Sequence, residues 1–189
     1  FLPCFCIMNS TESKVYKMKR QFSIRKTRRD EIDRATEIYD IGRAYMRKNG
    51  NSNQWSNGYP DSETVKKDIE SGVSYVVVNE NDFPVCVFAF IPGDDPTYKT
   101  IYNGKWLNDK EYCTIHRIAV AQQKHGLASL VFDWASDRAE NVRVDTHRDN
   151  IPMQNALLKN GFVYCGVIHL LNGDERLAYQ KTAIKGEKK

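Results

Sequence analysis

The hydrophobic positions of the chain recur with two different periods, which predicts a mixture of strands and helices. Alternating or continuous runs of β-branched and aromatic residues are typical of strands, and apolar residues three or four positions apart are typical of helices. Strands are predicted at 22–26, 74–79, 84–91, 111–120, 142–146, 162–170 and 176–182. Helices are predicted at 32–46, 61–71, 127–139 and 151–159.

Polar residues at the ends of these segments predict where the helices start and stop. Thr27, with Asp30 three residues later, is the predicted N-cap of the first helix, and Asp61 is that of the second. Pro152 suits the first turn of the last helix, which Gly161 follows.

The order of the elements predicts the topology of the sheet. Short turns at 80–82 and 172–174 join neighbouring strands, which are therefore antiparallel. The strand, helix, strand order of 111–146 requires a crossover between parallel strands. We expect an α/β (α+β) fold with a mixed, mostly antiparallel sheet of about seven strands, flanked by about four helices.

Composition places the chain among ordinary globular proteins. It has 189 residues, of which 41% are hydrophobic and 28% charged, enough for one sizeable core. These values argue against disordered, collagen-like and coiled-coil classes. No stretch approaches the roughly 18 to 20 apolar residues of a membrane-spanning helix, so we expect no membrane partner.

The distribution of charge along the chain is more informative about binding partners than the net charge of +4. Residues 1–29 contain eight basic residues and one acidic residue, and residues 181–189 contain four and one. The body, 30–180, therefore has a net charge of −6. Because the basic excess lies on the termini and not on a folded face, we expect no nucleic-acid partner, and an acidic body suits a cationic small molecule.

The cysteines and the first residues bear on the compartment. The five cysteines are odd in number, and only Cys4 and Cys6 lie close together, in a spacing unlike zinc or redox pairs. A reducing cytoplasm is therefore expected. The apolar stretch 1–8 is shorter than a usual signal core, and residues 1–21 are interpreted as an N-terminal tail or upstream remnant.

The most informative segment is the turn between the fourth strand and its helix. Gly126 lies directly before that helix, where unpaired backbone N–H groups and the helix dipole favour a phosphate. By itself such a turn is weak evidence, since many strand-to-helix turns need one glycine for steric reasons. The glycine patterns of P-loop and dinucleotide-binding proteins are both missing from the sequence.

Two motifs in this region resemble the GNAT superfamily of N-acetyltransferases. The acetyl-CoA loop of that family has Gln or Arg, then Gly three residues later, then Gly or Ala after one more residue, as do Gln123, Gly126 and Ala128. A second signature is an Asn followed by a Gly-Phe pair, as Asn150 is followed by Gly161-Phe162. The resemblance covers roughly 22–182, which it identifies as an N-acetyltransferase domain, with 183–189 as a basic C-terminal tail.

The resemblance implies an acyl-CoA N-acyltransferase fold, in which the fourth and fifth strands splay apart. It also implies direct transfer of an acetyl group from acetyl-CoA to a primary amine in a ternary complex, with no metal. Asn150 would bind the pantetheine arm, and the N–H of Val120 or its neighbour would polarise the thioester carbonyl. The backbone would hold the rest of acetyl-CoA: Ile118, Ala119 and Val120 the pantetheine, and Gln123, Lys124, His125, Gly126, Leu127, Ala128 and Ser129 the pyrophosphate.

Two features depart from the family pattern. The segment from Val120 to Gly126 is about two residues shorter than the usual loop, which would contract the phosphate site. The Tyr that commonly protonates the leaving thiolate is Leu157 here. A thiol with a pKa near 8.5 is a tolerable leaving group without that acid, so the activity is not excluded.

His116 is the predicted catalytic base. It lies four residues before Val120, so a regular strand would place both side chains on one face beside the splayed gap. An imidazole titrates near neutral pH, where an ammonium group must lose its proton, and some arylalkylamine acetyltransferases are similar in having a His at this offset. A structural His bound to a backbone carbonyl is the alternative, as is an acid/base pair formed by Asp145 and His147.

Trp55, Tyr59 and His147 are the residues predicted to contact the acceptor, a small-molecule or peptide amine. Trp55 and Tyr59 could instead cover the edge of the core. Aminoglycosides, polyamines, amino acids and protein N-termini all stay open as acceptors, because a fold does not fix a substrate. An inactive acyl-CoA-binding sensor or interaction module on the same fold is the alternative function, and homodimerisation is compatible with the sequence.

Overall fold

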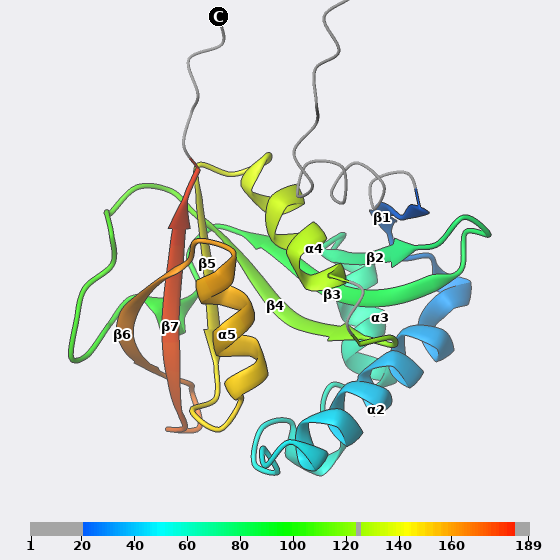
Figure 1. Cartoon of the computed structure of the whole chain (residues 1–189), viewed down its shortest axis with the longest axis horizontal. Coiled ribbons are helices and arrows are strands. Elements are labelled where there is room, and N and C mark those ends of the chain that lie inside the picture. Colours follow the sequence, from blue (N-terminus) through cyan, green and yellow to red (C-terminus); the bar gives the residue numbers. More distant parts are fainter. Residues whose placement is uncertain (1–20, 124–125, 184–189) are drawn as a thin grey trace, which may run out of the picture.

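The chain folds around one seven-stranded sheet, which the computed structural model describes for residues 21–123 and 126–183 (Figure 1). The strands lie in the order β1-β2-β3-β4-β5-β7-β6. Their bounds are Ser23–Lys26 (β1), Ser74–Val78 (β2), Pro84–Pro92 (β3), Cys113–Val120 (β4), Asn141–Thr146 (β5), Val163–His169 (β6) and Glu175–Thr182 (β7). Predictions for Lys124, His125, 1–20 and 184–189 lie outside the described residues.

Four α-helices within the described residues cover the two faces of the sheet. They are α2 (Ile32–Lys48), α3 (Ser62–Glu70), α4 (Leu127–Ser136) and α5 (Ile151–Lys159). Helices α2 and α3 bury a cluster around Ile38 and Val65 against one face. Helices α4 and α5 bury a larger cluster around Phe132 and Leu157 against the other. No helix in the described part of the chain is both long and apolar enough to cross a membrane.

The predicted elements are confirmed, with ends within three residues of the predicted ones. The pairing β1-β2-β3-β4 is antiparallel, β4-β5 is parallel, and β5-β7-β6 is antiparallel, which confirms the mixed sheet. Asp61 caps α3 as predicted, because its Oδ1 accepts a hydrogen bond from the backbone N–H of Thr64 at 2.8 Å. Short 3-10 turns at Arg29–Glu31 (η1), Ser56–Gly58 (η2) and Pro96–Tyr98 (η3) were not predicted.

The predicted N-cap at Thr27 is wrong. Its hydroxyl lies 2.7 Å from the hydroxyl of Ser74, and its backbone N–H donates to Ser74 O, so it belongs to the end of the β1-β2 pairing. The chain then forms η1 before α2 begins at Ile32. Glu31 stabilises this turn, since its carboxylate accepts from the backbone N–H of Arg28 and the guanidinium of Arg25.

Strands β4 and β5 pair over a short distance only. The paired residues are Cys113 with Val142 and Thr114 with Arg143, although β4 continues to Val120. Beyond these pairs the strands diverge, which confirms the predicted splay. The backbone groups along this side of β4 therefore have no ladder partner on β5.

Helix α5 provides a direct test of the packing. Leu157 is fully buried in the cluster with α4, and its neighbour Leu158 is 54% exposed. Leu157→Ala is expected to lower the free energy of unfolding by about 2–5 kcal/mol, because it leaves a cavity in the core. Leu158→Ala should change it by less than about 0.5 kcal/mol. Denaturant unfolding measures both, and equal effects would contradict the assigned face of α5.

Candidate active site

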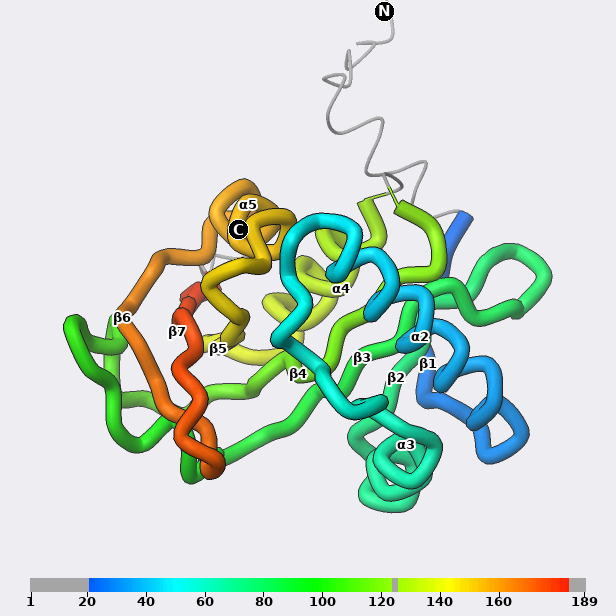
Figure 2. Tube along the Cα trace, turned by 90° about the horizontal axis from the view of Figure 1, so that it is seen from below, coloured from blue at the N-terminus to red at the C-terminus, as the bar shows by residue number. Residues whose placement is uncertain are grey.

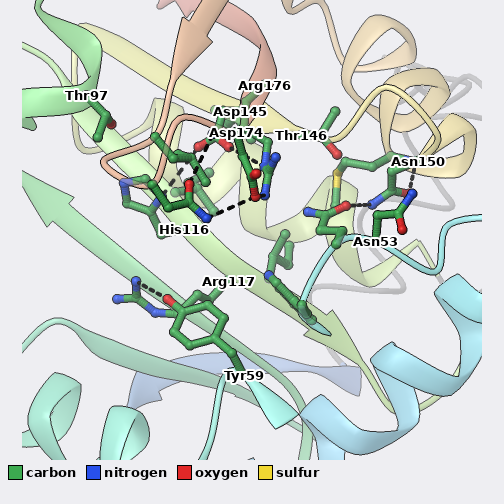
Figure 3. Close-up of a pocket in the computed structure, with 18 of the residues that line it drawn as sticks. Asn53, Tyr59, Thr97, His116, Arg117, Asp145, Thr146, Asn150, Asp174 and Arg176 are labelled. Atoms are coloured by element: carbon green, nitrogen blue, oxygen red, sulfur yellow. Dashed lines mark hydrogen bonds and ion pairs between the residues drawn. The ribbon is translucent and has the colours of Figure 1, made fainter. Parts of the chain in front are cut away.

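A cavity of about 540 Å³ lies where β4 and β5 diverge (Figure 3). Its walls come from the segment between α2 and α3, the second half of β4, the end of β5, and the turn between β6 and β7. Figure 2 shows the segment between α2 and α3, in cyan, beside the start of α5. A cavity of this size can hold a small molecule.

The imidazole of His116 lines this cavity from β4, where its side chain is 16% exposed. Nε2 lies 3.0 Å from Oδ2 of Asp95, which is a hydrogen-bond distance. Nδ1 lies 3.6 Å from Oδ1 of Asp145, which is beyond one. His116 is thus held between two carboxylates, with one ring nitrogen bonded and the other open toward Asp145.

Asp95 is itself fixed by the start of η3. Its Oδ1 accepts from the backbone N–H and the hydroxyl of Thr97, at 2.8 and 2.6 Å. Burial alone would raise the pKa of Asp95, but the hydrogen bonds from His116 and Thr97 outweigh it and lower the pKa to about 2. The carboxylate is therefore ionised above about pH 4, and the stability that it contributes is lost only as the pH falls from there toward 2.

Tyr98 supports the other carboxylate. Its hydroxyl donates to Oδ1 of Asp145 at 2.7 Å, and its ring stacks on Trp106 with the centroids 5.4 Å apart. Burial and then the negative charge of Asp145 raise the pKa of Tyr98 well above 10. Tyr98 therefore stays protonated and holds Asp145 in place beside His116.

A β-bulge at Arg117 changes the direction of the site side chains. His116 pairs with Ala89, and Ala119 pairs with Val87, so one residue of β3 opposes two residues of β4. Arg117, within the bulge, has a positive φ of 53°.

The bulge corrects the prediction that His116 and Val120 share a face. Ala89 and Val87 are two residues apart, so their partners His116 and Ala119 lie on the same face of the sheet. Ala119 packs in the cluster with α2 and α3, whereas Val120 packs against the cluster with α4. The extra residue in β4 thus places His116 and Val120 on opposite faces.

The same bulge directs Arg117 toward α3. Its Nε and Nη2 atoms bind the carboxylate of Asp68 at 3.0 and 2.8 Å, and Nη1 donates to the hydroxyl of Tyr59 at 3.3 Å. Burial raises the pKa of Asp68 against the opposing effect of Arg117. Tyr59, predicted from the sequence, thereby becomes part of the cavity wall, as Figure 3 shows.

Trp55, the other predicted aromatic, also lines the cavity. Its ring meets that of the buried Tyr39 edge to face, with the centroids 5.6 Å apart. The indole therefore covers the edge of the core at α2 and also borders the cavity.

The predicted donor-binding backbone lies along the splayed half of β4. Ile118 lines the cavity, and the side-chain amide of Gln123 lies 3.5 Å from Val120 O. Gly126 precedes α4 with a positive φ of 70° and no side-chain cap, which leaves the first N–H groups of the helix unbonded by a cap. Leu127 is buried in the core, and Ala128 and Ser129 are half-buried in the first turn.

Asn150 is at the cavity but is already bonded. Its Oδ1 accepts from the backbone N–H of Met153 at 3.3 Å, which makes it the N-cap of α5. Its Nδ2 donates to Oε1 of Gln54 at 2.9 Å, in the segment between α2 and α3. Thr146, close by on the cavity wall, is fully buried, and its hydroxyl has no hydrogen-bond partner among the described residues.

His147 does not line the cavity. Its Nδ1 accepts from the backbone N–H of Asp149 at 3.2 Å, and burial followed by the charge of Arg176 lowers its pKa. Its predicted contact with the acceptor stays a prediction. Asp145, the other member of the alternative acid/base pair, lies beside His116.

Sequence reasoning missed Asp95, Tyr98, Arg117 and Arg176 as site residues. Asp95 and Tyr98 lie at the two ends of η3, between β3 and β4, and Arg176 lies on β7. No local pattern in the sequence shows that β7 lies next to β5. One signal was available: Asp95 followed by Pro96 and Thr97 is typical of a capped turn. Within 21–123 and 126–183, no group of three or more His, Cys, Asp or Glu residues is placed to hold a metal ion.

Comparison with known proteins gives a close structural relative. No family model matches the chain, and a search of curated proteins finds no significant match. A GNAT-family acetyltransferase from Streptococcus agalactiae is 36% identical, with a TM-score of 0.80 over 87% of this chain and 96% of that chain.

More distant structures share the fold. A GNAT-family acetyltransferase from Listeria monocytogenes is 18% identical, with a TM-score of 0.64 over 85% of this chain and 94% of that chain. A chain of the NatC complex, solved with Gag peptide and CoA, is 13% identical, with a TM-score of 0.53 over 87% of this chain and 99% of that one.

The similarity to the streptococcal protein extends over most of both chains. The mixed sheet of this chain, with its parallel β4-β5 pair, matches the GNAT fold. On this evidence the chain belongs to the GNAT family and is a GNAT-type N-acetyltransferase.

Proposed function

We propose that this enzyme transfers an acetyl group from acetyl-CoA directly to a primary amine while both substrates are bound. The observation that carries this proposal is the position of His116, whose imidazole lines a cavity opened by the divergence of β4 and β5. Acetyl-CoA would supply the acetyl group as a reactive thioester. The chain would supply binding, orientation and one base.

The residues present fit an acyl-CoA. The unpaired side of β4 offers backbone groups to an amide-containing arm, through Ile118, Ala119 and Val120. The uncapped start of α4 after Gly126 offers N–H groups to a pyrophosphate. The unpartnered hydroxyl of Thr146 is a further polar group at the cavity that a bound ligand would satisfy.

His116 is the base in this proposal, and Asp95 positions it. When Nε2–H donates to Asp95, Nδ1 carries the lone pair and faces Oδ1 of Asp145 at 3.6 Å. Two acceptors then lie side by side, an arrangement that a protonated amine stabilises by donating to both. Asp145 would hold the ammonium group, and Nδ1 would take its proton before the nitrogen attacks.

Leu157 occupies the position of the family's usual acid for the leaving group, and its side chain cannot donate a proton. Leu157 is buried in the core, and the hydroxyl of Tyr98 is bonded to Asp145. In the proposed reaction, the N–C bond forms, the C–S bond breaks, and CoA leaves as a thiolate, which a thiol pKa near 8.5 permits. The proton that the nitrogen loses on becoming an amide passes to solvent.

The first prediction concerns the base. His116→Asn should lower kcat/KM for an accepted amine by about 10² to 10⁴-fold at neutral pH, because the amine must lose its proton without help. The defect should shrink as the pH rises toward about 10, where more of the amine is already neutral. A steady-state pH profile of wild type and variant measures both.

The control for this variant is donor binding. His116→Asn should keep the thermal shift caused by acetyl-CoA, which at 100 times its dissociation constant corresponds to roughly 2.7 kcal/mol. Equal activity of the two proteins at neutral pH would exclude His116 as the base. Loss of the thermal shift in the wild type as well would refute acetyl-CoA as donor.

The second prediction uses two buried threonines. The hydroxyls of Thr146 and Thr114 both lack a hydrogen-bond partner among the described residues, but only Thr146 lines the cavity. Either Thr→Val change removes an unsatisfied hydroxyl and should raise the free energy of unfolding by about 1 kcal/mol. Thr146→Val alone should weaken acetyl-CoA binding, measured by calorimetry. Unchanged affinity in Thr146→Val would contradict the proposed donor contact.

A further inference from the structure

The charged side chains around the cavity carry both signs. Three carboxylates, Asp95, Asp145 and Asp174, line it together with the guanidinium groups of Arg117 and Arg176. A polycation would meet two guanidinium groups, and a polyanion would meet three carboxylates. Such a lining is complementary to an acceptor that itself carries one charge of each sign.

The two arginines differ in what they already bind. Arg117 uses three of its nitrogens on Asp68 and Tyr59. The hydrogen bond that Arg176 makes within the described residues runs from Nη1 to Glu175 O at 2.8 Å. Its other contacts are longer: Nη2 lies 3.5 Å from Asp174, and Nε lies 4.0 Å from Asp145.

Arg176 is therefore a buried cation with hydrogen-bonding capacity left over. Its side chain is 8% exposed and borders the cavity. A guanidinium has five N–H donors in a fixed planar fork, which matches the two oxygens of a carboxylate. A carboxylate ligand is thus the group that its remaining donors fit.

Asp145 places this cation next to the base. One oxygen of Asp145 faces Nδ1 of His116, and the other faces Nε of Arg176. Figure 3 shows Arg176, Asp145 and Asp174 together on the cavity wall across from Tyr59, with His116 beside them. An amine at His116 and a carboxylate at Arg176 would lie on the two sides of one aspartate.

We propose that the acceptor is an amino-acid-like zwitterion, whose amine is acetylated at His116 and whose carboxylate is bound by Arg176. This inference rests on the proposed acetyl transfer and adds the substrate class. The carboxylate takes no part in bond making. One ammonium proton goes to His116 before attack, the amine nitrogen gains the acetyl carbon, the C–S bond breaks, and CoA leaves as thiolate. The second proton that the nitrogen loses on becoming an amide passes to solvent.

The test compares three forms of one skeleton as acceptors for the wild-type enzyme. Phenylalanine, phenylalaninamide and 2-phenylethylamine form one series, and leucine, leucinamide and 3-methylbutylamine form another. We expect kcat/KM for the acid to exceed that for the amide and the simple amine by about 10- to 100-fold, because charged hydrogen bonds to Arg176 are lost without the carboxylate. The amide is less basic than the acid and the simple amine is more basic, so amine basicity cannot produce this order.

The variant Arg176→Gln assigns the preference to one side chain. We expect the ratio of kcat/KM for acid to that for simple amine to fall about 10-fold or more, mainly through a higher KM for the acid. Arg148→Gln removes the same charge from a side chain that is 61% exposed and paired with Glu175, and it should keep the wild-type ratio. Retention of the acetyl-CoA thermal shift in Arg176→Gln shows that the variant is folded.

The outcomes separate this inference from the proposed function. Three results would overturn the acceptor class alone. The wild type could use all three forms equally, it could acetylate simple amines or spermidine but not acids, or it could bind acetyl-CoA and acetylate no acid. An equal loss for all three forms in Arg176→Gln would overturn the role of Arg176. Failure to bind acetyl-CoA would overturn the proposed function itself.

Discussion

The short pairing between β4 and β5 is the constraint on which the site depends. Two residue pairs hold the strands together at one end, and β4 then continues for six residues without a partner on β5. Backbone groups that are buried without a partner are costly, so such a gap persists only where a ligand or water can reach it. The sheet therefore lacks part of its hydrogen-bond ladder at this point, and a cavity walled by rigid strands lies there instead. Side chains on either strand then face a common space.

The bulge at Arg117 determines which side chains enter that space. Without the extra residue, His116 and Ala119 would lie on opposite faces of the sheet, because they are three residues apart. With it, both face α2 and α3, and Arg117 reaches Asp68 on α3. A single backbone irregularity thus places His116 on the same face as Ala119 and lets Arg117 tie β4 to α3. Bulges next to active sites commonly redirect a side chain in this way.

The limits of prediction from the sequence follow from the same physics. Strands and helices were predictable because their periods are local, and the glycine turn before α4 was predictable because a motif occupies consecutive residues. The bulge was not, since Arg117 carries no local signal for a positive φ, and it made the assumed strand period fail between His116 and Val120. Asp95, Tyr98 and Arg176 were out of reach because contacts across 21 or more residues bring them to His116 and Asp145.

Asn150 shows how closely the two halves of the site are joined. The family resemblance places it on the donor side, yet its side chain caps α5 and donates to Gln54 on the acceptor side. Gln54 Oε1 also accepts from Asn51, so it bridges the segment after α2 and the start of α5. An acetyl donor that bound the side-chain amide of Asn150 would have to share this amide with Gln54 or break the hydrogen bond between Asn150 and Gln54. The hydrogen bond from Asn150 to Gln54 thus ties the start of α5 to the segment that carries Trp55 and Tyr59.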